Sequence, residues 1–279
     1  MSAALQLGPV ALSWTVLLVL AAFIAGHAYA AHASKRCGVD LRNPALGLFL
    51  LAVVVARLSF VWSYRQAYLD APLGIFDIRD GGWDPQTGII AAWVCTLVFV
   101  RARAEVRKPL VMSVGIASAV WIAGTAAAWW MPRDETRMPA LALSSFDGST
   151  QQLLAFEGKP TVINLWATWC PPCRREMPVL EQAQRDHAEV HFVFLNQKES
   201  ARQVEGFLRG SRLTLHNVLL DPKGEAGARF GVTAFPTTLF FDASGRLVDQ
   251  RLGELSKASL AQKLRAIQRD GGGGRGEGR

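Results

Sequence analysis

Trp169-Cys170-Pro171-Pro172-Cys173 is the stretch that decides the fold of this chain. It follows the apolar, β-branched run Thr161–Trp166 and precedes a helical pattern. A Cys-x-x-Cys pair at a strand-to-helix junction is typical of a dithiol that cycles with a disulfide. One thiolate attacks a disulfide in a partner protein, and the second thiol resolves the mixed disulfide. The helix N-terminus favours the thiolate because it carries partial positive charge.

Two other interpretations of the cysteine pair are weaker. A structural zinc site needs four ligands, but Cys37 and Cys95 lie far away in a hydrophobic region, and the five histidines offer no paired spacing. A purely structural disulfide would close a loop too small to stabilise a fold usefully. We therefore expect a redox pair with no metal and no cofactor.

Composition divides the chain into two halves. Its 279 residues suffice for two domains, and 50% of them are hydrophobic, most of these in the first half. We predict a four-span α-helical membrane domain at 1–132, a linker and first strand region at 133–145, an α/β domain at 139–268 and a disordered tail at 269–279. The net charge of +7 is not interleaved with aromatic residues, so we expect no nucleic acid partner.

Four apolar stretches predict the membrane spans, at Val10–Ala31, Pro44–Trp62, Gly88–Val100 and Pro109–Met131. The first, second and fourth are long enough to cross a bilayer. The third is short, and a buried soluble helix is its alternative. A cleaved signal peptide is the alternative for the first stretch, but residues 1–13 contain no Lys or Arg.

Loop charge predicts the orientation of these spans. The loop between the second and third stretches holds Arg65 and Arg79 with four aspartates, whereas the flanking loops are basic and free of such acidic excess. Basic loops stay in the cytoplasm. We therefore expect a bacterial inner-membrane protein whose N-terminus and α/β domain are periplasmic, with Trp129 and Trp130 at the outer interface. The basic residues of the two flanking loops are Lys35, Arg36, Arg42, Arg101, Arg103, Arg107 and Lys108.

The first half also carries a family resemblance. Ala56-Arg57-Leu58, Tyr68–Leu73 and Ile78–Trp83 resemble the early part of prolipoprotein diacylglyceryl transferase, over about residues 20–95. Gln86 occupies the position of that family's catalytic histidine, so we interpret this half as a derived membrane module. Arg57 is a candidate for lipid contact because an intramembrane charge is costly. Its alternatives are snorkelling or pairing with a polar neighbour.

Strands and helices alternate in the second half, which predicts an α/β sandwich. A hairpin is expected around Asp147-Gly148, and Pro178 should kink the helix in which it lies. The strands are expected at Thr161–Trp166, His191–Leu195, Thr237–Phe241 and Leu247–Leu252, and the helices from Cys170, at Ser200–Leu208, at Glu225–Phe230 and at Leu255–Ile267.

This half resembles a second family. Leu165–Cys173 with Glu176-Met177-Pro178 resembles thioredoxin-fold proteins of the TlpA/ResA class, and Asn196–Ser200 and Gly231–Thr238 match further motifs of that class. The resemblance covers about residues 139–268. It implies a thioredoxin fold with an extra βα element after the active-site helix, and an extracytoplasmic disulfide reductase.

Roles at the site follow from chemistry and from this resemblance. We expect Cys170 to be the exposed nucleophile and Cys173, one turn into the helix, to be the buried resolving thiol. Pro236 resembles the cis-proline that faces the dithiol, with a trans proline as its alternative. The supporting residues are Trp166, Trp169, Pro171, Pro172, Asn164, Phe235 and Thr237.

Proton transfer needs a group other than Asn164. Thioredoxin has a buried Asp at this position, and Asn cannot titrate. Glu199 matches the class's acidic residue near the dithiol, so we assign it proton transfer to and from Cys173. The alternative is an exposed Glu that precedes a helix.

The two prolines predict a reducing couple. Pro171 and Pro172 have no N–H, so the Cys170 thiolate relies on the N–H and S–H of Cys173 and on the helix dipole. We predict that the pKa of Cys170 is only modestly depressed.

The favoured function is a membrane-anchored periplasmic reductase of protein disulfides. Its partners would be disulfide-bonded clients, such as apocytochrome c with oxidised haem-site cysteines, membrane lipid, and a separate membrane electron donor, because the spans hold no cysteine pair. Three alternatives stay open: a lipid-binding protein or transferase with a redox appendage, a non-catalytic thiol-dependent interaction module, and an oxidase or peroxidase.

Overall fold

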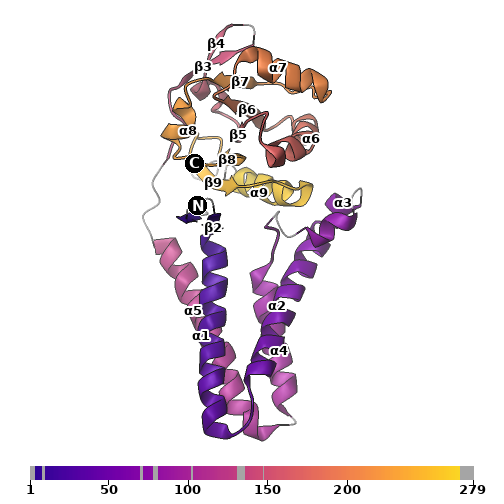
Figure 1. Ribbon diagram of the computed structural model, residues 1–279, viewed down its shortest axis with the longest axis vertical. Coiled ribbons are helices and arrows are strands. Elements are labelled where there is room, and N and C mark those ends of the chain that lie inside the picture. Colours follow the sequence, from indigo (N-terminus) through magenta and orange to yellow (C-terminus); the bar gives the residue numbers. More distant parts are fainter. Residues whose placement is uncertain are drawn as a thin grey trace, which may run out of the picture. The chain divides into compact units, whose positions relative to one another are not determined.

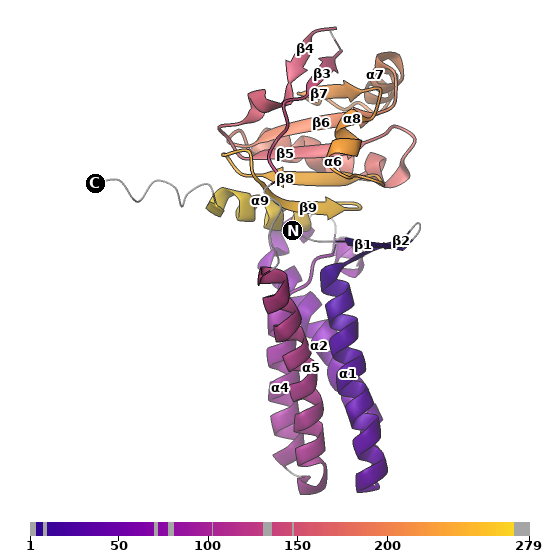
Figure 2. The same cartoon turned by 90° about the vertical axis from the view of Figure 1, so that its left-hand side faces the viewer.

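The computed structural model describes residues 4–7, 10–69, 72–77, 81–101, 103–130, 136–146 and 148–270. Contacts divide the chain into a helical unit and an α/β unit (Figures 1 and 2). Several predicted features fall outside the described residues: the span end Met131, the linker residues 133–135, the turn residue Asp147 and the tail at 271–279.

Four long helices build the helical unit, and three of them have the length and composition to cross a membrane. The three are Trp14–Cys37, Arg42–Ser63 and Ala104–Ala128, whereas Pro85–Arg101 is shorter. The predicted fourth span therefore stays a prediction. The elements are α1 (Trp14–Cys37), α2 (Arg42–Ser63), α3 (Arg65–Tyr68), the 3₁₀ helix η1 (Pro72–Phe76), α4 (Pro85–Arg101) and α5 (Ala104–Trp130).

The first helix begins later than the sequence predicts. Residues Val10–Ser13 form strand β2, which pairs antiparallel with β1 (Ala4–Leu7). The predicted start of the span at Val10 is therefore wrong, because these backbone groups bond to a neighbouring strand and α1 starts at Trp14. Helix α5 starts earlier than predicted and includes Pro109.

Small residues let the helices pack closely. A Cβ on Gly26 of α1 would lie 2.9 Å from the carbonyl oxygen of Ser113 in α5, and the Ser113 hydroxyl donates to the Gly26 carbonyl at 2.9 Å. Likewise, a Cβ on Gly88 of α4 would lie 2.6 Å from the carbonyl oxygen of Ala52 in α2. Close approach of this kind is how membrane helices associate without a hydrophobic driving force.

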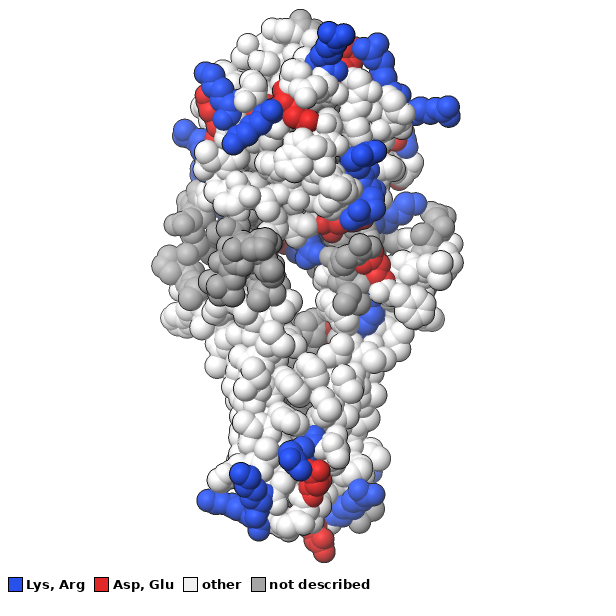
Figure 3. All heavy atoms as spheres, viewed as in Figure 1, with Lys and Arg blue, Asp and Glu red and all other residues white. Residues whose placement is uncertain are grey.

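Charge gathers at one end of the helical unit. Basic residues cluster where α1 and α4 end and where α2 and α5 begin, and Figure 3 shows them in blue at that end together with acidic residues. On the sides, Leu50, Val54 and Leu58 of α2 recur every four residues and are each more than half exposed. An apolar flank with charges at its end is what a bilayer requires of its protein surface.

A seven-stranded mixed sheet forms the α/β unit, in the order β4-β3-β7-β6-β5-β8-β9. Strands β5, β6 and β7 are parallel, and the others pair antiparallel. The bounds are β3 Ala142–Ser145, β4 Thr150–Gln152, β5 Thr161–Trp166, β6 His191–Gln197, β7 Val218–Asp221, β8 Thr237–Phe241 and β9 Leu247–Leu252.

Helices cover both faces of this sheet. Val162 and Trp166 of β5 pack with α6 (Pro171–Asp186), α7 (Ala201–Gly210) and α9 (Lys257–Asp270), whereas Ile163 and Leu165 face η3 (Leu153–Phe156) and α8 (Glu225–Arg229). This alternation is the two-residue period of a strand buried on both faces. The thioredoxin-like α/β fold is confirmed, and the additional βα element after the active-site helix stays a prediction.

Most predicted elements of this half are present. Strands β5, β8 and β9 have the predicted bounds, and β3 and β4 form the predicted hairpin. Helix α6 continues through Pro178. The sequence analysis missed β7, a four-residue strand that directly follows Asn217 with its positive φ of 57°. It also placed 269 and 270 in the tail, although α9 includes both.

Candidate active site

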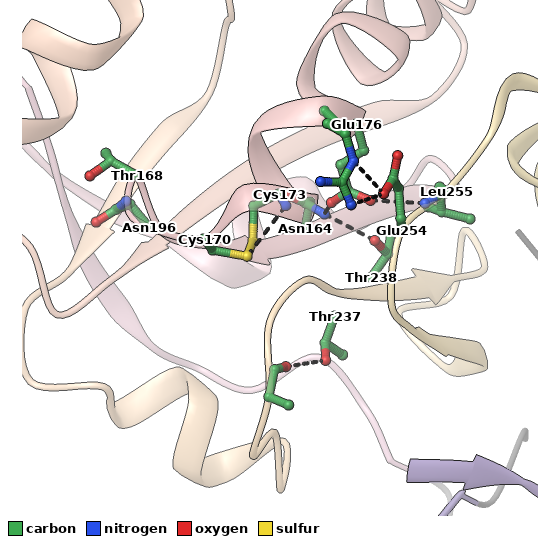
Figure 4. Close-up of a disulfide and its surroundings, with 12 residues drawn as sticks. Asn164, Thr168, Cys170, Cys173, Glu176, Asn196, Thr237, Thr238, Glu254 and Leu255 are labelled. Carbon is green, nitrogen blue, oxygen red and sulfur yellow. Dashed lines mark hydrogen bonds and ion pairs between the residues drawn. A yellow bond between two sulfur atoms is a disulfide. The ribbon is translucent and has the colours of Figure 1, made fainter. Parts of the chain in front are cut away.

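Cys170 sits at the junction that the sequence predicts, between the end of β5 and the start of α6. Its side chain caps the helix by accepting the Cys173 N–H, with 3.3 Å between nitrogen and sulfur. Pro171 and Pro172 occupy the first helical positions, where a missing N–H costs least. Cys170 and Cys173 are joined as a disulfide (Figure 4). The Cys173 N–H is therefore a donor to Cys170, as the two prolines predicted.

The exposure of the two cysteines corrects one expectation. Cys170 is only 3% exposed and Cys173 is fully buried, so in this disulfide form the expected exposed Cys170 is wrong. Both cysteines belong to the hydrophobic cluster that contains Trp166, whose ring centroid lies 5.5 Å from that of Phe207, whereas Trp169 is 66% exposed.

Pro236 follows a cis peptide bond after Phe235, as expected from the resemblance. The Phe235 ring lies edge-on to Trp169, with 6.2 Å between centroids. Thr237 is buried, and its hydroxyl donates to the Ala234 carbonyl at 2.7 Å. Strand β8 thus brings this loop beside the end of β5, where Leu165 pairs with Thr237.

Asn164 is buried in β5 and contacts a carboxyl group that the sequence analysis gave no role. Its Nδ2 donates to Glu176 Oε1 at 2.8 Å and to the Thr238 hydroxyl at 3.0 Å. The other Glu176 oxygen accepts the Leu255 N–H at 3.0 Å. Glu176 has no exposed surface, and burial raises its pKa to about 8 although both hydrogen bonds act in the opposite direction. A buried carboxyl group with a raised pKa therefore lies beside Asn164 (Figure 4).

One signal could have revealed Glu176 in the sequence. It follows Cys173 by three residues and lies on the same helix face as Met177 and Leu180, which are both fully buried. A carboxyl on the apolar face of an amphipathic helix is unusual, because carboxyl groups are rarely buried without partners. The spacing alone therefore marks Glu176 as a functional candidate.

Glu199 is buried as well, with 7% of its surface exposed. It accepts hydrogen bonds from the Thr168 backbone N–H, from the Thr168 hydroxyl and from Asn196 Nδ2. The alternative of an exposed residue before a helix is therefore wrong. These partners place Glu199 against the loop that leads to Cys170, and its predicted role in proton transfer stays a prediction.

In the helical unit, Arg57 is buried rather than free on the helix surface. Its guanidinium donates to the carbonyl oxygens of Ile75 at 3.1 Å, Gly74 at 3.3 Å and Gly82 at 2.7 Å. The rings of Phe60, Tyr68 and Trp83 each lie with their centroid 5.8 Å from its central carbon. These contacts match the alternative in which Arg57 pairs with polar neighbours, and lipid contact stays a prediction. Gln86 is the second residue of α4.

No metal centre accompanies the dithiol in the described part of the chain. Those residues contain no group of three or more His, Cys, Asp or Glu side chains placed to hold an ion. The two remaining cysteines, Cys37 and Cys95, are free.

Known proteins resemble each half of the chain. Residues 133–264 match the family model described as Redoxin, and residues 2–131 match that of prolipoprotein diacylglyceryl transferase. Thioredoxin-like protein YneN of Bacillus subtilis is 35% identical over 45% of this chain and 75% of its own length. Thiol-disulfide oxidoreductase ResA of Bacillus thuringiensis is 30% identical over 46% of this chain and 75% of its own length. The chain belongs to this thioredoxin-like family of thiol–disulfide oxidoreductases.

A further relative of this oxidoreductase is the thiol:disulfide interchange protein DsbE homolog of Paracoccus denitrificans, 34% identical over 45% of this chain and 70% of that protein. The match to the transferase family confirms the resemblance seen in the first half. The correspondence of Gln86 to that family's catalytic histidine stays a prediction. The oxidoreductase thus joins a redox unit to a helical unit that resembles prolipoprotein diacylglyceryl transferase.

Proposed function

We propose that this oxidoreductase is a membrane-anchored reductase of protein disulfides on the periplasmic side of a bacterial inner membrane. The observation that carries the proposal is the Cys170 sulfur at the start of α6, with one backbone donor from Cys173. A helix N-terminus stabilises a thiolate. Because Pro171 and Pro172 offer no further N–H, the Cys170 thiolate is stabilised only slightly. A weakly stabilised thiolate favours a reducing dithiol.

Reduction proceeds in two exchanges. The Cys170 thiolate attacks one sulfur of the client disulfide, forms a mixed disulfide and releases the first client thiolate. Cys173 then loses its proton and attacks the Cys170 sulfur, which releases the second client thiolate. The client gains two electrons, and the enzyme is left with the Cys170–Cys173 disulfide. Two protons complete the client thiols.

Glu176 is the group best placed to exchange a proton with Cys173, and its ionised fraction, which grows as the pH rises towards about 8, is the form that accepts the proton. Glu176 lies one helical turn after Cys173 on the same face of α6, and both side chains are fully buried. Its pKa of about 8 is close to that of an ordinary thiol. Proton exchange is most efficient when the pKa of the base lies near the working pH. Water supplies the other proton, which replaces the one that Cys170 lost when its thiolate formed.

The charge distribution of the helical unit supports the orientation. Lys35, Arg36 and Arg101 close helices α1 and α4 at the same end at which α2 and α5 begin. Basic residues mark the cytoplasmic side, so the chain leaves α5 on the periplasmic side. Cys37 and Cys95 are separate free cysteines, and a different membrane protein must therefore re-reduce the site. Apocytochrome c with oxidised haem-site cysteines is one proposed client.

A lipid-related role is the second candidate, and the transferase family match favours it. Three carbonyl oxygens and three rings already surround Arg57, which leaves little of the guanidinium for a lipid phosphate. Gln86 cannot act as a base in the way a histidine does. We therefore expect no transfer of a diacylglyceryl group from phospholipid to a prolipoprotein substrate, and measurable transfer would restore this candidate.

Reduction of insulin by the full-length protein in detergent, with dithiothreitol as electron source, tests the proposal. We expect the wild-type protein to accelerate reduction and Cys170→Ala to reduce insulin no faster than dithiothreitol alone. Oxidation of a reduced client by the disulfide form is measured in parallel. If the protein oxidises clients faster than it reduces them, it is an oxidase and the proposed direction is wrong.

A further inference from the structure

The backbone around Glu199 turns its side chain away from solvent. Lys198 before it has a left-handed φ of 59°, and Ser200 after it caps α7 through a reciprocal pair of hydrogen bonds with Gln203. The residue is only 7% exposed, although it lies in the loop between β6 and α7. The local conformation thus fixes Glu199 against the neighbouring loop, between β5 and α6.

Both carboxylate oxygens of Glu199 are occupied. Oε2 accepts the Thr168 backbone N–H and Asn196 Nδ2, each at 2.7 Å, and Oε1 accepts the Thr168 hydroxyl at 2.5 Å. Hydrogen bonds to an ionised acceptor are shorter and roughly twice as strong as neutral ones. One carboxylate therefore holds the backbone and the side chain of Thr168 at the same time.

Thr168 lies in the turn that delivers Cys170 to the helix. Within this turn the Cys170 N–H donates to the Ala167 carbonyl at 3.3 Å, and the Cys170 sulfur accepts the Cys173 N–H. A shift of Thr168 would move both ends of this short turn. The position of the Cys170 sulfur relative to the start of α6 therefore depends on what holds Thr168.

We propose that Glu199 is a positioning residue that clamps Thr168, and through it the turn that carries Cys170, and that Glu199 carries no proton to or from Cys173. This inference rests on the proposed function because it needs Cys170 to be the attacking thiol. Both oxygens of Glu199 already accept hydrogen bonds from Thr168 and Asn196, and no contact of Glu199 with Cys173 is among them. Proton exchange with Cys173 falls to Glu176 instead.

Exchange kinetics test the clamp. The reduced full-length protein in detergent is mixed with glutathione disulfide, and the rate is followed from about pH 6 to about pH 9. The variants are Glu199→Gln, Thr168→Val, Thr168→Ser and the Glu199→Gln/Thr168→Val double variant. Glu205→Gln is the matched control, because Glu205 lies on the same loop–helix segment but is exposed and paired only with Arg209 on α7. Circular dichroism checks that each variant is folded.

We expect Glu199→Gln to react about tenfold more slowly and Thr168→Val about threefold more slowly than the wild type, by the same factor at every pH. The double variant should be no slower than Glu199→Gln, because both changes break the same clamp. Thr168→Ser keeps the hydroxyl and should restore most of the rate, and Glu205→Gln should match the wild type.

Three results would overturn the clamp. The first is equal rates for Thr168→Val and Thr168→Ser, because only the serine keeps the hydroxyl. This comparison stays informative even if Glu199→Gln does not fold. Another is a Glu199→Gln deficit that grows towards one end of the pH range, as expected of a proton carrier. The third is a double variant whose rate is reduced by the product of the two factors found for Glu199→Gln and Thr168→Val alone, as expected of independent sites. A wild type no faster than Cys170→Ala would overturn the proposed function itself.

Discussion

Each half of the chain buries a side chain that is normally charged, and the two halves treat that side chain differently. Arg57 in the helical unit meets three carbonyl oxygens and three aromatic rings. Glu176 in the α/β unit accepts hydrogen bonds from two neutral donors, and its side chain is fully buried. Burial of an ion is tolerated only when hydrogen bonds or opposite charges compensate it. The charge of Arg57 is therefore compensated by its neighbours, whereas burial of Glu176 favours the neutral form of its carboxyl group.

This difference also separates the cysteines. Cys170 and Cys173 share a helix start with a nearby proton-exchanging group, whereas Cys37 and Cys95 are single residues in α1 and α4 of the helical unit. A lone cysteine among apolar helices usually serves packing rather than chemistry. We therefore expect redox chemistry in the α/β unit and only a packing role for the cysteines of the helical unit.

The largest expected effect concerns the cysteines. Cys170→Ala should abolish reduction of insulin, because the attacking thiolate is lost. Cys37→Ala and Cys95→Ala should retain the full rate with dithiothreitol as donor. The assay is the turbidity of reduced insulin with full-length protein in detergent. A strong loss of activity in Cys37→Ala or Cys95→Ala would place redox chemistry in the helical unit and break the division.

Glu176→Gln should remove a pH dependence of stability. Because the pKa of Glu176 is raised to about 8 in the folded protein, the folded state prefers the protonated form. The contribution of Glu176 to the free energy of unfolding is fully present below the ordinary pKa of a glutamate. It is lost as the pH rises through about 8. The amide stays neutral throughout, so the variant should be more stable than the wild type in alkali, by about 5 kcal/mol at most.

Guanidinium unfolding of the oxidised protein at acid and alkaline pH measures this effect, with tryptophan fluorescence as the signal. Glu181→Gln is a control on the same helix, since Glu181 is paired with Arg185 near the surface. Parallel loss of stability in Glu176→Gln and wild type would show that another group titrates.

Arg57→Met should destabilise the helical unit by about 3 kcal/mol, because it leaves several buried carbonyl oxygens without a donor. Arg57→Lys keeps the charge but cannot reach three carbonyls in the same planar geometry, and an intermediate loss is expected. Thermal aggregation of the full-length protein in detergent reports the change. An unchanged midpoint in Arg57→Met would mean that the guanidinium is not a structural tie, and would favour a role in lipid contact.

The smallest expected effect is at the contact between α1 and α5. Ser113→Ala removes the hydrogen bond to the Gly26 carbonyl and should cost about 0.6 kcal/mol. By contrast, Gly26→Leu should disrupt the pair of helices, since even its Cβ would meet the Ser113 carbonyl at 2.9 Å. The same aggregation assay measures both. Equal effects of the two substitutions would argue against close packing at this point.

Local patterns explain why much of the redox unit could be predicted. Thr161–Trp166 and Thr237–Phe241 are short apolar runs bounded by turn residues, and both strands have the expected ends. The Cys170–Cys173 pair needs only four consecutive residues to define its chemistry. Features whose cause lies within a few residues can be read without knowledge of the tertiary structure.

Features that depend on distant contacts could not be predicted. Burial of Glu176 results from Asn164 on β5 and Leu255 before α9, which are 12 and 79 residues away. Arg57 finds its carbonyl partners 17 to 25 residues further along the chain. In both cases a charged residue type within an apolar pattern could be noticed in the sequence. Its hydrogen-bond partners, and therefore its role, could be identified only from the folded structure.

Trapping of the mixed disulfide tests the central claim most directly. Reduced Cys173→Ala is mixed with an oxidised client protein, and the covalent adduct is mapped by mass spectrometry after proteolysis. The account predicts an adduct through Cys170 that dissolves on addition of dithiothreitol, and none with the Cys170→Ala/Cys173→Ala double variant. An adduct through Cys37 or Cys95, or equal trapping by the double variant, would contradict it.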